Sequence, residues 1–157
     1  MADSTIEIRI DAAEDSRVVA LLEAHLATMR AASPPASVFA LDLEGLRADD
    51  VAFWAMWKNA SVVACGALRE LSPMHGEIKS MHTDKTHRGR GFGAKMLEHI
   101  LTQANDRGYA RLSLETGSPD IFLPAQRLYQ RFGFDFCDAF SPYEPNPFSV
   151  FMTRELS

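Results

Sequence analysis

A run of alternating glycines and arginines is the segment whose residue types most clearly predict chemistry. It is Arg88-Gly89-Arg90-Gly91-Phe92-Gly93. Glycine permits positive φ and lets a ligand approach the backbone closely. The run lies between a predicted strand and a predicted long helix, where free N–H groups favour an anion, and the two arginines add positive charge there. The segment therefore predicts a binding site for a pyrophosphate.

Other phosphate-binding loops do not fit this segment. A Walker loop needs Gly-x-x-x-x-Gly-Lys and a dinucleotide loop needs Gly-x-Gly-x-x-Gly, and the sequence contains neither. Arginine–glycine runs also occur in RNA-binding tracts, but those are repeated and disordered, whereas this one is single and precedes a helix. A plain glycine-rich turn stays open as the alternative.

A second motif lies downstream of the glycine run. It is Leu128-Tyr129-Gln130-Arg131-Phe132-Gly133-Phe134. With Arg88-x-x-Gly91-x-Gly93 before it, the chain resembles the GNAT superfamily of acyl-CoA-dependent acyltransferases, whose signatures are Gln/Arg-x-x-Gly-x-Gly/Ala and Leu-Tyr-x-x-x-Gly-Phe. The order of predicted elements also matches over essentially the whole chain, so we expect a single domain of residues 1–157.

The resemblance implies that acetyl-CoA is the cosubstrate and that no metal takes part. The loop would bind the CoA pyrophosphate, and the strand before it would pair with the pantetheine arm. Where the family often has asparagine, seven residues before the motif tyrosine, this chain has Phe122, and Gln126 is the candidate replacement. The implied cofactor-binding residues are Met81, His82, Thr83, Arg88, Gly89, Arg90, Gly91, Phe92, Gly93, Gln126 and Tyr129.

Acetyl transfer to an amine needs an acid and a base. An ammonium has a pKa near ~10, so a base helps to remove its proton, and an acid protonates the departing thiolate. By resemblance, Tyr129 is the acid and Glu77 is the first candidate for the base. Lys79 is its neighbour on the same strand face, so the two side chains could equally form a structural ion pair. Glu115, at the end of the next predicted strand, is the second candidate.

Strand alternation also predicts which face each side chain of the segment 77–83 occupies. It places Met81 and Thr83 on the face of Glu77, and His82 on the opposite face. His82 is expected to be either a packed residue or a neighbour of the cofactor.

The resemblance implies that the acceptor pocket is built by the first helices and by loops near the C-terminus. The candidates for it are His25, Met29, Arg30, Trp54, Trp57, Lys79 and the loop 140–148, with Trp54 and Trp57 as core residues being the alternative. This mixture of aromatic and cationic groups favours a small primary amine that also carries a carboxylate or an aromatic ring, such as an amino acid. A non-catalytic acyl-CoA sensor or partner subunit is the alternative.

The elements that must position these residues follow from the hydrophobic pattern. Alternation and turn residues predict strands at 5–10, 51–57, 61–69, 77–84, 111–115, 134–137 and 149–153. Helical spacing predicts helices from an N-cap at Asp11 to Ser33, at 43–46, at 91–107 and from Pro124 to Gly133. The expected fold is α/β (α+β mixed), a mostly antiparallel sheet of about seven strands flanked by about four helices.

The bulk composition is that of an ordinary soluble domain. Apolar residues make up 46% and charged residues 24% of 157 residues. The net charge of −5 argues against nucleic-acid binding, and no apolar run reaches the ~20 residues of a membrane span. Neither a secretory signal nor a disulfide is expected, with Cys65 and Cys137 as reduced thiols, so we expect a cytoplasmic protein. A homodimer is compatible with the resemblance.

Overall fold

The computed structural model describes residues 5–11, 13–35 and 43–156. Its strands are β1 (Ile6–Ile10), β2 (Val51–Lys58), β3 (Ser61–Ser72), β4 (His75–Thr83), β5 (Arg111–Gly117), β6 (Asp135–Cys137) and β7 (Ser149–Glu155). Its helices are α1 (Ser16–Ala32), α2 (Leu43–Leu46), α3 (Phe92–Asp106) and α4 (Leu123–Arg131), with short 3-10 turns η2 (Lys85–His87) and η3 (Asp120–Phe122).

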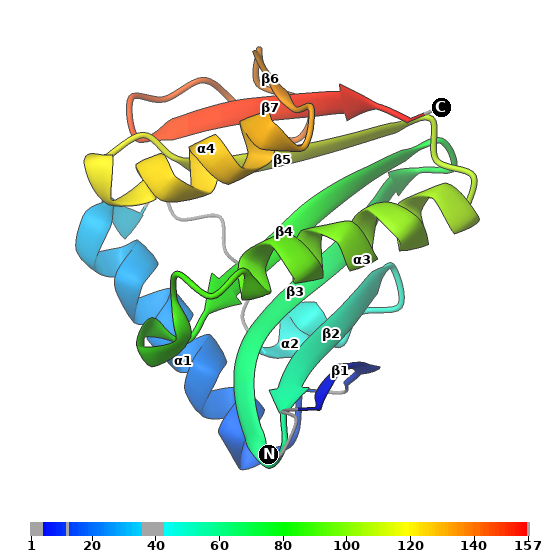
Figure 1. Ribbon diagram of the computed structural model, residues 1–157. Coiled ribbons are helices and arrows are strands. Elements are labelled where there is room, and N and C mark those ends of the chain that lie inside the picture. The colour runs from blue at the N-terminus through cyan, green and yellow to red at the C-terminus, as the bar shows by residue number, and fades with distance from the viewer. Residues whose placement is uncertain (1–4, 12, 36–42, 157) are drawn as a thin grey trace.

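The seven strands form one sheet in the order β1-β2-β3-β4-β5-β7-β6. The β4–β5 pair is parallel, and the other neighbouring strands are antiparallel. In Figure 1, α3 and α4 cross the near face of the sheet. The expected mixed α/β fold, with a mostly antiparallel sheet and four helices, is confirmed.

The sheet carries a hydrophobic core on each face. On one face, Met56 and Leu68 pack with Met96 and Ile100 of α3. On the other face, Phe53 and Ala67 belong to a cluster with residues of α1 and α2. Because alternate residues of β2 enter different clusters, both faces of the central strands are covered. Trp54 and Trp57 are 4% and 5% exposed, one in each cluster, so their assignment to an acceptor pocket was wrong.

The first helix begins later than the sequence indicated. Asp15, rather than Asp11, is its N-cap, and the Asp15 carboxylate accepts from the Arg17 N–H. Asp11 instead accepts from the backbone N–H of Ala13 at 2.7 Å. Both aspartates can cap an N–H two residues on, so the pattern alone did not distinguish the turn from the helix. The difference moves the start of α1 but not its buried face.

A β-bulge in β4 changes which side chains share a face. Ala67 of β3 pairs with Lys79, but Cys65 pairs with His82, so β4 contains one extra residue. Ser80 lies at this point with a φ of 55°, in the left-handed region. The extra residue reverses the alternation, so His82 shares the face of Lys79.

The bulge therefore overturns the predicted alternation of the segment 77–83. Glu77, Lys79 and His82 face α1. Met81 packs instead on the α3 side, where its sulfur lies near Gly66. Thr83 also lies on that side, with its hydroxyl near Gly93.

Gly66 is a sensitive point because α3 packs directly against it. A Cβ there would lie 2.8 Å from Ile100 Cδ1 and 2.9 Å from Met96 Cγ. We expect Gly66→Ala to lower the free energy of unfolding by about 1–3 kcal/mol, measured by urea denaturation. In the matched variant Gly93→Ala the new Cβ meets nothing closer than 3.4 Å. Equal stability of the two variants would contradict this packing.

Candidate functional site

The cavity of the molecule opens where β4 and β5 separate. Their paired residues run from His75–Arg111 to Ile78–Leu114, although β4 continues to Thr83 and β5 to Gly117. Beyond the last pair the two strands diverge (Figure 1), and a cavity of roughly 590 Å³ lies there. The backbone of β4 from Lys79 onward has no partner in β5, so an extended ligand could pair with it.

Most of the predicted site residues line this single cavity. From α1, β4 and β5 these are His25, Met29, Lys79, Met81, His82, Thr83 and Glu115. From the glycine loop and the following helices they are Arg88, Gly89, Gly91, Phe92, Gly93 and Tyr129. Arg90, Gln126 and Glu77 are not among the lining residues.

The glycine loop forms one end of the cavity. Gly89 and Gly91 have φ of 79° and 81°, and a Cβ at either would meet no atom within 4 Å. Gly91 is also the N-cap of α3, so the free N–H groups of the first helical turn begin here. The Arg88 Nε donates to the Thr83 carbonyl at 3.3 Å, which places its positive charge beside the loop.

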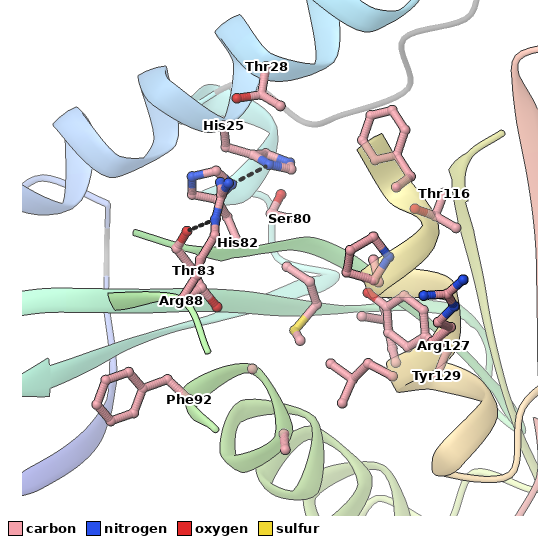
Figure 2. A pocket seen from close by; sticks show the side chains of 18 of the residues that line it. His25, Thr28, Ser80, His82, Thr83, Arg88, Phe92, Thr116, Arg127 and Tyr129 are labelled. Atoms are coloured by element: carbon pink, nitrogen blue, oxygen red, sulfur yellow. Dashed lines mark hydrogen bonds between the residues drawn. The ribbon is translucent and has the colours of Figure 1, made fainter. Parts of the chain in front are cut away.

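Two arginines that the sequence analysis did not predict also line the cavity. Arg127 and Arg131 are four residues apart on α4, so they lie on the same face of the helix. The four-residue spacing of the two arginines could have indicated a shared binding surface, but the same spacing is equally common on helix faces that only contact solvent. Arg88 adds positive charge at the glycine loop, whereas Arg127 lies beside Tyr129 on the other side of the cavity (Figure 2). Gln126, in contrast, donates from Nε2 to the Gly117 carbonyl at 2.8 Å and ties α4 to β5.

Tyr129 contributes a protonated hydroxyl to the cavity wall. Its side chain is 5% exposed, and burial together with the nearby Glu115 charge raises the pKa of the phenol above its ordinary value. Glu115 faces the cavity from β5, and burial raises its pKa as well. A phenol held in its protonated form can donate a proton to a developing anion.

Glu77, the first candidate for the base, is fully buried in an ion pair. Its Oε2 accepts from the Tyr143 hydroxyl at 2.6 Å and lies 3.3 Å from Lys79 Nζ. Lys79 Nζ also donates to the Tyr143 hydroxyl at 2.6 Å. This geometry matches the alternative interpretation of a structural ion pair. Tyr143 belongs to the loop 140–148 that we expected near the acceptor.

Two histidines from distant segments meet in the cavity (Figure 2). His25 Nδ1 and His82 Nδ1 are 3.3 Å apart, and the ring centroids are 5.0 Å apart. Burial, followed by the nearby His82, lowers the pKa of His25 to about 3. For His82, burial and then Arg88 lower the pKa to about 4, against the opposing effect of Asp84. Both rings are therefore neutral near neutral pH, and their contact depends on the bulge that places His82 on the face of Lys79.

Neither a metal cluster nor a membrane span is evident in the described part of the chain. Residues 5–11, 13–35 and 43–156 contain no group of three or more His, Cys, Asp or Glu side chains that could hold a metal ion. No helix in these ranges has the length and apolarity to cross a membrane. Cys65 and Cys137 are both free thiols, as expected.

Comparison with known proteins identifies relatives along most of the chain. Residues 18–134 match the family model described as the acetyltransferase (GNAT) family. An uncharacterised N-acetyltransferase of Bacillus subtilis strain 168, YsnE, is 47% identical over 96% of this chain and 100% of its own length.

Solved structures show the same fold. A Klebsiella pneumoniae protein assigned to the acyl-CoA N-acyltransferases is 30% identical, with a TM-score of 0.78 over 99% of this chain and 100% of its own. A Bacillus subtilis acetyltransferase solved in complex with CoA has a TM-score of 0.73 at 16% identity, over 98% of this chain and 100% of its own.

The lowered pKa values of His25 and His82 predict how stability depends on pH. A histidine with an ordinary pKa of 6.5 in the unfolded chain takes up a proton below that pH, whereas the folded pair stays neutral down to about 4. Stability should therefore fall as the pH drops from 6.5 towards 4, by at most about 1.4 kcal/mol per pH unit for each histidine. Urea denaturation across this range measures the slope.

The double variant His25→Gln, His82→Gln is the control, because it retains every carboxylate and lacks both rings. Its free energy of unfolding should depend less steeply on pH than that of the wild type. Equal slopes would show that the two rings titrate normally in the folded protein.

Proposed function

The chain belongs to the GNAT family of acetyltransferases, and we propose that it transfers an acetyl group from acetyl-CoA to the primary amine of a small, amino-acid-like molecule. The reaction proceeds by direct attack within a ternary complex. The Cys65 thiol is fully buried and its pKa is raised by burial to about 12, so it is a poor nucleophile.

The opened edge of β4 and the cationic loop fit CoA. Beyond Ile78 no residue of β4 pairs with β5, so the edge of β4 at Met81, His82 and Thr83 is open to an extended pantetheine arm. The loop from Arg88 to Gly93 offers N–H groups without any Cβ over Gly89 or Gly91, which leaves room for a pyrophosphate. Arg88, Arg127 and Arg131 supply compensating charge. The solved CoA complex of the Bacillus subtilis acetyltransferase supports this choice of cosubstrate.

The charge on the acceptor side of the cavity is the observation that supports an amine as the acceptor. Lys79 is neutralised by the ion pair with Glu77, and both histidines are neutral near neutral pH. The Glu115 carboxylate therefore gives this wall a net negative charge, which attracts an ammonium group and repels an anionic acceptor. His25, Met29 and Lys79 form the wall against which the rest of the acceptor lies.

Tyr129 and Glu115 are the catalytic groups of this proposal. The acceptor nitrogen attacks the thioester carbonyl, so that a C–N bond forms and the C–S bond breaks. The Tyr129 hydroxyl donates its proton to the leaving sulfur, and Glu115 holds the incoming ammonium and stands as the carboxylate candidate for the base. Glu77 fixes Lys79 from outside the cavity.

We also place the reaction in the cytoplasm, because both cysteines are free and the cosubstrate is intracellular. Residues 1–157 are proposed to act as one domain, on a substrate that is neither nucleic acid nor membrane. A homodimer stays a prediction.

Replacing Tyr129 tests the enzymatic proposal. We expect wild-type protein to release CoA thiol from acetyl-CoA in the presence of 2-phenylethylamine, L-lysine or spermidine. Tyr129→Phe should lower kcat by about 10²-fold, because the leaving thiolate loses its proton donor, while CoA affinity is unchanged. Tyr109→Phe is the matched control, since the Tyr109 hydroxyl contacts Glu70 and does not line the cavity. CoA binding without turnover of any amine would favour a sensor.

Replacing Gly91 tests the cofactor site. Gly91→Glu places a side chain and a negative charge in the pyrophosphate seat, and calorimetry should show that CoA binding is lost. Gly108→Glu is the control, because Gly108 also has positive φ and an open surround but lies past the other end of α3. The two variants share the backbone strain and the added charge. Equal CoA affinities for them would remove the loop from the site.

A further inference from the structure

The His25–His82 pair lines the cavity, and its ring nitrogens have no role so far in the proton transfers of the proposed reaction. We infer that this pair, rather than a carboxylate, accepts the proton that the acceptor nitrogen loses during acetyl transfer. The inference rests on the proposed function. It begins from the short contact between the two Nδ1 atoms, at 3.3 Å, and from the position of both rings on the cavity wall.

The contact between two Nδ1 atoms restricts the tautomers of the pair. One ring must donate its Nδ1–H and the other must accept with its Nδ1 lone pair. The donating ring then has no proton on Nε2, so that nitrogen carries a free lone pair. The accepting ring orients it, much as a carboxylate orients a histidine in a catalytic dyad. The pair therefore contains one proton acceptor and one positioning residue.

The position of the pair suits this role. In Figure 2, the rings of His25 on α1 and His82 on β4 lie next to each other, and Tyr129 lies on the opposite side of the cavity. The bulge at Ser80 turns His82 to this side, shortly after the point where β4 leaves β5. An acceptor bound against α1 and a thioester entering between the strands would therefore meet beside the pair.

Neither carboxylate is as well placed to take the proton. Glu77 does not line the cavity, and its Oε2 is occupied by Lys79 and the Tyr143 hydroxyl. Glu115 is close enough to Tyr129 for its charge to raise the tyrosine pKa. Its charge therefore helps to keep Tyr129 protonated, a function that protonating Glu115 would remove.

The charged groups around the pair leave it neutral at rest. Arg88 disfavours a proton on His82 and Asp84 favours it, while the buried Cys65 thiol, opposite His82 on β3, is uncharged. A neutral pair has a lone pair available throughout the physiological range. Sharing the acquired proton along the Nδ1–Nδ1 contact spreads the new positive charge over two rings.

The proton balance of the step is complete. The ammonium that Glu115 attracts first loses one proton to solvent. The neutral primary amine then attacks the carbonyl and becomes a positively charged nitrogen, which is much more acidic than the free ammonium. One of its protons passes to the free Nε2 of the pair, and the Tyr129 hydroxyl proton passes to the leaving sulfur. Exchange with solvent returns a proton to Tyr129 and removes one from the pair. The products are the N-acetylated amine and CoA thiol.

Long-range ¹H–¹⁵N NMR of the histidine rings tests the pair without any acceptor. We expect one of the two rings in its Nδ1–H tautomer, the other in its Nε2–H tautomer, and both neutral well below an ordinary histidine pKa of 6.5. Two Nε2–H tautomers, or two rings that titrate independently near 6.5, would overturn the inference.

Kinetics test the proton-accepting role, with the most active of 2-phenylethylamine, L-lysine and spermidine as acceptor. His25→Gln and His82→Gln should each lower kcat, the larger loss being about 10²-fold, with unchanged affinity for CoA by calorimetry. The ring with the larger effect should be partly rescued by added imidazole when it is replaced by alanine. His99→Gln is the control, because His99 stacks on Trp54 and does not line the cavity.

The possible failures are distinguishable. Retention of kcat within about threefold in both glutamine variants, or loss without imidazole rescue, would overturn the inference while leaving the enzymatic proposal intact. If the wild type acetylates none of the three amines, the proposed acceptor class fails. The NMR tautomers then decide whether the pair exists in the form required.

Discussion

The bulge at Ser80 is the local constraint on which the site depends. It inserts one residue into β4 against β3, two residues after Ile78, the last residue that pairs with β5. Beyond this point β4 stays paired with β3 but no longer pairs with β5, and the cavity lies where β4 and β5 separate. Positive φ at a serine costs free energy, and the surrounding pairing of β3 with both flanks of the bulge holds it in place.

The bulge also determines which β4 side chains face the proposed cofactor and which face the proposed acceptor. Before it, Glu77 and Lys79 face α1, and after it His82 faces α1 again because one residue has been added. Met81 and Thr83 are thereby left on the α3 side, next to the glycine loop. An unbulged strand would have placed His82 among the residues of the α3 face and left His25 without this contact.

The buried ion pair shows how the acceptor wall acquires its charge. A fully buried carboxylate is costly unless it is paired and hydrogen-bonded, and Glu77 has Lys79 and Tyr143 as partners. This arrangement joins the loop 140–148 to β4 and neutralises the one lysine that lines the cavity. In the proposed reaction Glu115 is then the charge that faces the acceptor, so this structural ion pair would set the electrostatics of the site.

Most helices and strands, and many of the residues that line the cavity, could be predicted from sequence patterns. The features that could not be predicted have physical causes. The glycine loop and the helix after it were predictable because glycine spacing and helical periodicity are local properties, whereas Tyr129 was singled out by the resemblance to the family motif. The bulge was not, because strand alternation assumes that no residue is inserted. Trp54 and Trp57 were misassigned since an aromatic residue in a strand looks alike in a core and in a pocket.

The two walls of the cavity shift proton affinities in opposite directions. Burial and the Glu115 charge raise the pKa of Tyr129, which keeps a proton available beside the cosubstrate. Burial lowers the pKa of His25 and His82, which keeps a lone pair available beside the acceptor. Burial disfavours charge on any group, so the same low-polarity surroundings make the phenol a stored donor and the imidazoles stored acceptors. A reaction that delivers one proton to sulfur and removes one from nitrogen needs this division, and the β4 bulge contributes to it by placing His82 on the same side as His25.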